Sequence, residues 1–166
     1  FVMGRLFGTD GIRGKAGEFP LDAATVRVIG RALAHQFSSK GQPHFVIGRD
    51  TRESGAEIER AVCEGIAAGG GTADSAGVLT TPGIAFLASK FEYDAAVVIS
   101  ASHNPFEDNG IKIFLPSGKK LGEEQERAIE KEIAEARGHN GGDIALVSPN
   151  DARVEEFRHA YLEHLA

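Results

Sequence analysis

Residues 101–112 (Ala-Ser-His-Asn-Pro-Phe-Glu-Asp-Asn-Gly-Ile-Lys) gather a hydroxyl, an imidazole, amides, two acids and a lysine in one turn-rich stretch. Ser102 follows a continuous apolar run, so we expect it at the end of a buried strand with its hydroxyl open to a ligand. A serine in that position can act as a nucleophile or carry a phosphoryl group. Phosphorylation would add about −1.5 to −2 units of charge. Hydrogen-bond donors for that charge are available from His103, Lys112 and the loop amides. Lys112 can reach Ser102 because it lies in the next strand, and pairing of the two strands can bring the two residues side by side.

The same residues also fit an Asn-Pro turn in which the Ser102 hydroxyl bonds to its own backbone. A Ser/His hydrolase is disfavoured, because Ser102 and His103 are sequence neighbours and neighbours do not easily align as nucleophile and base. On the residues alone, the phosphoryl carrier and the plain turn both remain open.

Composition narrows the function classes. The 166 residues carry a net charge of −6, which argues against general nucleic-acid binding but leaves a small anion held by local arginines and backbone amides. Cys63 is the only cysteine, and the six histidines show no His-Glu-x-x-His pattern, so a zinc site is disfavoured. The longest apolar run, residues 95–101, is far shorter than the ~20 residues of a membrane span. No signal segment opens the chain, so a cytoplasmic location is expected.

Apolar patterning predicts alternating strands and helices. We expect strands at 44–48, 72–79, 95–101 and 111–115, with a short strand-like run at 5–9. We expect helices at 21–37, from a Ser54 cap to the glycines at 69–71, from 81 through 87, at 122–137 with six solvent-facing glutamates, and around 154–165. This order predicts an α/β domain, a three-layer αβα sandwich around a mostly parallel mixed sheet. Loops 8–14, 49–54 and 101–110 would then meet at the carboxyl edge of that sheet, where ligands bind.

Five ordered segments carry a family resemblance. They are residues 7–14 (Phe-Gly-Thr-Asp-Gly-Ile-Arg-Gly), 48–55 (Gly-Arg-Asp-Thr-Arg-Glu-Ser-Gly), 80–83 (Thr-Thr-Pro-Gly), 100–105 (Ser-Ala-Ser-His-Asn-Pro) and 108–112 (Asp-Asn-Gly-Ile-Lys). Together they resemble the α-D-phosphohexomutases, and within that family the branch of bacterial phosphoglucosamine mutases.

The resemblance implies a role for each matched residue. Ser102 matches the serine that holds the transferable phosphoryl group, and His103 and Asn104 match its loop neighbours. Arg13 and Lys112 match residues implicated in acid/base or electrostatic help. Further matches for substrate and phosphate binding, or for support of the loops, are Thr9, Asp10, Gly11, Arg49 and Asp50. From the residues alone, Arg49, Asp50 and Arg52 also fit an ion-paired loop.

The resemblance also implies a reaction and its cofactors. Phosphorylated Ser102 would give its phosphoryl group to glucosamine 6-phosphate, and the bisphosphate would reorient and return its other phosphate to Ser102, leaving glucosamine 1-phosphate. Mg²⁺ would bridge the phosphoserine and an acidic loop, and glucosamine 1,6-bisphosphate would serve as activator. In this reading Ser102 is a metal ligand only through its phosphate, and the partner is a hexosamine phosphate, with no nucleic acid or membrane.

The full enzymes of this family have four domains, and their metal loop (Asp-x-Asp-x-Asp-Arg), sugar-selecting loop and phosphate-gripping loop do not occur in residues 1–166. We therefore expect domain I at 1–138, a linker at 139–150, and at 151–166 a terminal helix that could begin domain II. We expect the isolated chain to be a poor catalyst that can self-associate. Two alternatives remain, a fragment of the sister mutases for mannose or glucose phosphates and a non-catalytic stand-alone domain.

Overall fold

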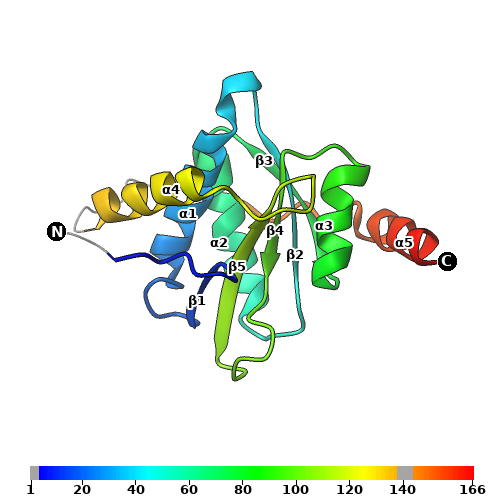
Figure 1. The fold of residues 1–166 in the computed structure, drawn as a ribbon, viewed down its shortest axis with the longest axis horizontal. Coiled ribbons are helices and arrows are strands. Elements are labelled where there is room, and N and C mark those ends of the chain that lie inside the picture. The colour runs from blue at the N-terminus through cyan, green and yellow to red at the C-terminus, as the bar shows by residue number, and fades with distance from the viewer. Residues whose placement is uncertain (1–3, 138–143) are drawn as a thin grey trace.

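A computed structural model describes residues 4–137 and 144–166 (Figure 1). The strands are β1 Ile12–Lys15, β2 His44–Arg49, β3 Thr72–Val78, β4 Ala95–Ile99 and β5 Asp108–Phe114. The α-helices are α1 Ala23–Gln36, α2 Gly55–Ala68, α3 Thr81–Lys90, α4 Glu123–Ala136 and α5 Val154–Leu165, and a 3₁₀ turn spans Ser38–Lys40.

The strands form one sheet in the order β1-β5-β4-β2-β3. Strand β2 pairs in parallel with β3 and with β4, whereas β5 is antiparallel to both β4 and β1. Four strands therefore run in one direction and β5 alone opposes them. This arrangement confirms the predicted mixed sheet and the α/β class.

Helices cover both faces of the sheet, as Figure 1 shows with α1, α2 and α4 on one side and α3 and α5 on the other. The strand β4 explains the arrangement, because its side chains alternate between two cores. Val97 and Ile99 belong to the core with α1, α2 and α4, and Ala96 and Val98 belong to the core with α3 and α5. A strand covered on both faces has no reason to alternate polar and apolar residues. The continuous apolar run at 95–101 is therefore a consequence of the three-layer fold.

The expected strand at 5–9 is wrong. That segment holds only an isolated bridge at Gly8, and the first strand, β1, begins at Ile12 within the expected loop 8–14 and ends one residue beyond it. The reason is a tight turn in which Gly8 and Gly11 exchange backbone hydrogen bonds, so that pairing with β5 starts only at Ile12. The Glu130 carboxylate accepts the backbone N–H groups of Leu6 and Phe7 at 2.6 and 2.9 Å and so takes the place of a neighbouring strand.

Two expectations about helix surfaces also need correction. Ser54 was expected to cap α2, but its side chain makes no capping bond and its Oγ instead accepts a hydrogen bond from Asn109 Nδ2 at 2.8 Å. The six glutamates of α4 were expected to face solvent, but Glu126 and Glu130 are buried. Glu130 is buried because its carboxylate pairs with the chain entering β1.

The terminal helix α5 packs against the sheet. Phe157 is fully buried in the core shared with α3, and Asn150 just before the helix accepts the Ser75 N–H and donates to the Asp74 carboxylate at 2.8 Å. Residues 139–143 of the expected linker, and residue 138 before it, lie outside the described residues. Among the helices in the described ranges, none is long and apolar enough to cross a membrane.

Candidate functional site

Ser102 lies in the loop that joins β4 to β5, with an exposed side chain and a positive φ of 50°. A positive φ is uncommon for a residue other than glycine, and such conformations concentrate at functional sites. The Ser102 N–H donates to Ser100 Oγ at 3.1 Å, which holds the backbone as the chain leaves β4. Because Ser102 is exposed, a ligand can reach its hydroxyl.

Two cations converge on the Ser102 hydroxyl. Lys112 Nζ lies 2.9 Å from Ser102 Oγ and Arg13 Nη2 lies 3.4 Å from it. Their positions follow from the register, because Arg13 pairs with Gly110, and Lys112, two residues along β5, projects from the same face. Gly110 leaves room for this approach, since a Cβ on it would stand 3.0 Å from Arg13 Cγ and 2.6 Å from the Ser100 carbonyl oxygen.

The surroundings of Lys112 lower its pKa. Burial lowers the pKa of Lys112, and the Arg13 guanidinium lowers it further, while Asp10 and Asp50 act in the opposite direction. Lys112 therefore loses its proton at a lower pH than an exposed lysine does. A neutral amine beside Ser102 Oγ can accept the hydroxyl proton, and the charged form can stabilise a phosphate.

Asn104 links the loop to these cations. Its Oδ1 accepts from Arg13 Nη1 at 3.2 Å, and its Nδ2 donates to the Asp108 carboxylate at 3.1 Å. His103, by contrast, has an exposed side chain that makes no hydrogen bond to any residue within the described ranges. The structure thus brings Asn104 into the Ser102 cluster but leaves the His103 ring free for solvent or a ligand.

Arg49 and Arg52, at and just after the end of β2, bind different partners. Arg49 ends β2 and points to α2, where its Nη1 donates to the buried Glu59 carboxylate at 2.8 Å. Burial raises the pKa of Glu59, and the bonds from Ser75 and Arg49 oppose that rise. This is the ion-paired alternative, so Arg49 does not reach Ser102. Asp50 is likewise paired, since its carboxylate accepts from the backbone N–H and the Nε of Arg52 at 3.0 and 3.2 Å.

Arg52 was expected only as part of an ion-paired loop, but it belongs to the site. Its guanidinium is nearly buried and donates to carbonyl oxygens of the Ser102 loop. The sequence contains one signal for this role of Arg52. It is the third charged residue, after Arg49 and Asp50, of a loop expected at the carboxyl edge of the sheet.

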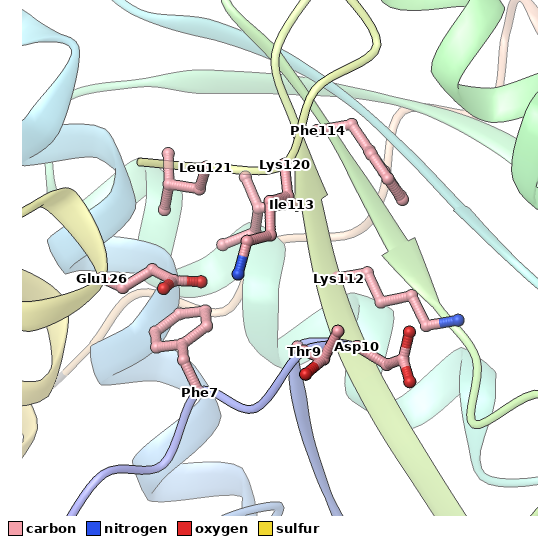
Figure 2. Close-up of a pocket in the computed structure, with 10 residues that line it drawn as sticks. Phe7, Thr9, Asp10, Lys112, Ile113, Phe114, Lys120, Leu121 and Glu126 are labelled. Atoms are coloured by element: carbon pink, nitrogen blue, oxygen red, sulfur yellow. The ribbon is translucent and has the colours of Figure 1, made fainter. Parts of the chain in front are cut away.

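The first loop lines a hollow of about 110 Å³ that begins at Lys112. Figure 2 shows Lys112 and Asp10 at one end of it, with Phe7 and Glu126 at the other. Thr9 and Gly11 complete this side, and the Asp10 carboxylate lies 3.9 Å from Arg13 Nη2. The hollow therefore joins the first loop to the cations that hold Ser102.

The described residues include no group of three or more His, Cys, Asp or Glu side chains that could hold a metal ion. The side chains nearest to Ser102 Oγ are cations, which suit an anion and not a divalent metal. The described part of the chain therefore does not fit an Mg²⁺ site by itself.

Comparison with known proteins shows the family of this chain. Residues 4–139 match the family model described as phosphoglucomutase/phosphomannomutase, alpha/beta/alpha domain I. The phosphoglucosamine mutase of Syntrophus aciditrophicus is 54% identical over 132 residues, covering 79% of this chain and 29% of the relative. That of Koribacter versatilis is 45% identical over 158 residues, covering 92% and 34%.

A solved structure of a protein from this family has a similar fold. A phosphoglucomutase/phosphomannomutase family protein from Burkholderia thailandensis superimposes with a TM-score of 0.71 at 28% identity, covering 94% of this chain and 35% of that one. The chain thus spans about a third of the length of the relatives it matches. With a family model matched over most of its length, the chain belongs to the phosphoglucomutase/phosphomannomutase family, of which it contains the α/β/α domain I.

Proposed function

We propose that this chain is the first domain of a phosphoglucosamine mutase and that Ser102 carries the phosphoryl group during interconversion of glucosamine 6-phosphate and glucosamine 1-phosphate. The observation that carries the proposal is the convergence of Lys112 and Arg13 on the exposed Ser102 Oγ at 2.9 and 3.4 Å. Phosphoryl transfer depends mainly on positioning and on positive charge around the phosphoryl oxygens. Two cations fixed on adjacent strands supply both.

The phosphoryl-accepting step can be written from these groups. Ser102 Oγ forms a bond to the phosphorus of glucosamine 1,6-bisphosphate, and the bond from that phosphorus to the sugar oxygen breaks. The serine proton passes to the neutral Lys112 amine, whose lowered pKa favours that form, and the departing sugar oxygen takes a proton from the resulting Lys112 ammonium by way of water. The Arg13 guanidinium stays charged and stabilises the phosphoryl oxygens. In the opposite direction, phosphorylated Ser102 gives its group to the 6-phosphate sugar.

The remaining loops have supporting roles in this proposal. Thr9, Asp10 and Gly11 line the hollow that starts at Lys112, and it is there that we place part of the sugar phosphate. His103 is free to contact a bound phosphate, whereas Arg49 and Asp50 support the loop structure through their ion pairs. The choice of glucosamine over other sugars rests on the names of the phosphoglucosamine mutase relatives.

In this proposal Mg²⁺ would meet this chain only through a phosphate on Ser102, where it would neutralise charge on the transferring group. The described residues offer no cluster of carboxylates that could hold the ion by itself. We further propose that residues 1–138 are domain I, that 139–150 are a linker and that 151–166 begin domain II. A chain without the acidic metal loop would turn over slowly by itself.

The test is to expose the chain to glucosamine 1,6-bisphosphate and Mg²⁺ and to map phosphate by peptide mass spectrometry. Label on Ser102, and none in Ser102→Ala, is the expected result. Ser89→Ala is a matched control, since Ser89 is an exposed serine on α3, away from the Ser102 loop. Label spread over several serines, or label that survives in Ser102→Ala, would overturn the assignment.

A further inference from the structure

The guanidinium of Arg52 has no donor left for a ligand. An arginine offers five N–H donors in a planar fork, and every one of them is used within this chain. Nε donates to the Asp50 carboxylate at 3.2 Å. The four remaining bonds go to backbone carbonyl oxygens of the serine loop: Nη1 to Pro105 at 2.6 Å and Asp108 at 3.0 Å, and Nη2 to Ser102 at 2.9 Å and Asn104 at 3.0 Å.

The environment of Arg52 also differs from that of Arg13. The Arg52 side chain is 10% exposed, and Asp50 fixes its plane through Nε while accepting the Arg52 N–H as well. Arg13 is more exposed, at 26%, and directs its donors to the Ser102 hydroxyl and the Asn104 side chain. One arginine therefore faces the reacting group, and the other holds the backbone behind it.

The hydrogen bonds from Arg52 to the loop carbonyls also fix the direction of the N–H groups that follow those carbonyls. In a trans peptide the C=O and the following N–H point in opposite directions. The carbonyls of Ser102 and Pro105 point to Arg52, so the N–H groups of His103 and Phe106 point away from it. Neither N–H has a hydrogen-bond partner within the described part of the chain. These two amides are not consecutive, because the Asn104 N–H donates to the Ala101 carbonyl oxygen and Pro105 has no N–H, but each is a free donor that an anion at this loop can use.

We propose that Arg52 is a positioning residue: by binding the loop carbonyls it holds Ser102 at its positive φ, keeps Oγ beside Lys112 and Arg13, and turns free amides toward the phosphate. The inference rests on the proposed function of Ser102 as phosphoryl carrier. It assigns Arg52 no contact with substrate, because its donors are all engaged. Replacing the fork by a single ammonium should therefore loosen the loop while the positive charge remains.

The experiment compares Arg52→Ala and Arg52→Lys with wild type and with a control, Arg27→Ala. Arg27 also pairs with a buried carboxylate, Glu64 at 3.3 Å, but it lies between α1 and α2 away from the loop. All variants are assayed well below their melting temperatures for the rate of Ser102 phosphorylation by glucosamine 1,6-bisphosphate with Mg²⁺. Arg52→Ala is repeated with millimolar guanidinium chloride or sodium chloride. Amide NMR spectra of residues 101–110 are recorded for each.

We expect Arg52→Ala to slow phosphorylation at saturating bisphosphate by about 100-fold, the size of effect that a 1 Å misplacement can produce. The half-saturating concentration should stay near that of wild type, Arg52→Lys should give little recovery, and guanidinium should restore part of the rate where sodium does not. Arg27→Ala should react like wild type. A purely structural role would lower the melting temperature without a rate change in the folded protein or a guanidinium response.

Failure of the inference and failure of the proposed function are separable. If wild type is labelled and folded Arg52→Ala is labelled equally fast, the inference is overturned and the function of Ser102 stands. If wild type is not labelled, the proposed function fails for this chain and the amide spectra decide the inference. Loop shifts that change in Arg52→Ala and return with guanidinium support it, and spectra that match wild type overturn it.

Discussion

Gly11 sets the approach of the first loop to the sheet, so Gly11→Ala tests how the site is assembled. Its φ is 85°, and a Cβ built on it would stand 2.2 Å from the carbonyl oxygen of Ile111 and 3.1 Å from Cα of Lys112. These neighbours are backbone atoms of β5 and cannot move aside as a flexible side chain would. The alanine must push the turn away from β5, and Arg13, two residues on, must move with it.

Two separate contributions give the size of the effect. Placing a residue with a Cβ in a left-handed conformation costs about 1–2 kcal/mol. Forcing an extra carbon into a packed contact costs a further ~1–3 kcal/mol. Gly11→Ala should therefore lower the free energy of unfolding by about 2–5 kcal/mol, a large share of the roughly 5–15 kcal/mol by which a domain is stable.

Gly118 provides the matched control. It has a φ of 86° in the turn after β5, and a Cβ there would meet nothing within 4 Å. Gly118→Ala should thus show the conformational cost alone, about 1–2 kcal/mol. Urea unfolding of both variants gives the difference, and Ser102 labelling of the folded fraction reports whether Arg13 has moved. Equal losses in the two variants, with labelling unchanged, would refute the argument that close approach to β5 positions Arg13.

Three further predictions concern single side chains. Burial lowers the pKa of Lys112 from its ordinary 10.5. Phosphorylation of Ser102 should therefore speed up as the pH rises through that lowered pKa, and the free energy of unfolding should rise over the same pH range. An NMR titration of Lys112 that gives a pKa of 10.5 or above would contradict this. Burial raises the pKa of Cys63 to about 12, so alkylation by iodoacetamide at neutral pH should follow urea unfolding, and fast reaction of the folded chain would disagree with the packing. Phe157→Ala should cost about 3–5 kcal/mol in urea unfolding because the ring is fully buried, whereas the exposed Leu162→Ala should change stability by no more than about 0.5 kcal/mol.

The elements with strong apolar patterns could be predicted from the sequence. The run at 95–101 indicated a strand covered on both faces, and β4 is such a strand. The sequence also contains a signal for the opposite direction of β5. Only residues 100–107 separate β4 from β5, and a parallel crossover needs a dozen residues or more. Strand β1 could not be predicted in this way, because it has only four residues, one of them Gly14, and so gives no periodic pattern.

The division of work among the arginines depends on where β2 ends. Ile47 faces the core with α1 and α2, and side chains two residues apart share a face of a strand. Since β2 extends through Arg49, that side chain must point to α2, where Glu59 meets it. The predicted strand stopped at residue 48, so its alternation could not choose between the role that the family resemblance implies for Arg49 and an ion-paired loop. With Arg49 inside β2, the alternation favours the ion pair.

The same alternation explains why the cations gather on one side of the sheet. Ile111 and Ile113 face the core with α1 and α2, as does Ile12, so Lys112 and Arg13 must project from the opposite face. There they meet only where β5 and β1 are paired in this register, and slipping β1 by one residue would turn Arg13 into the core. The close contact of Gly11 with β5 sets that register, and Arg52 holds the serine loop against it. The chemistry of Ser102 thus depends on residues that need never touch its ligand, and the charge pattern of the sequence alone does not reveal them.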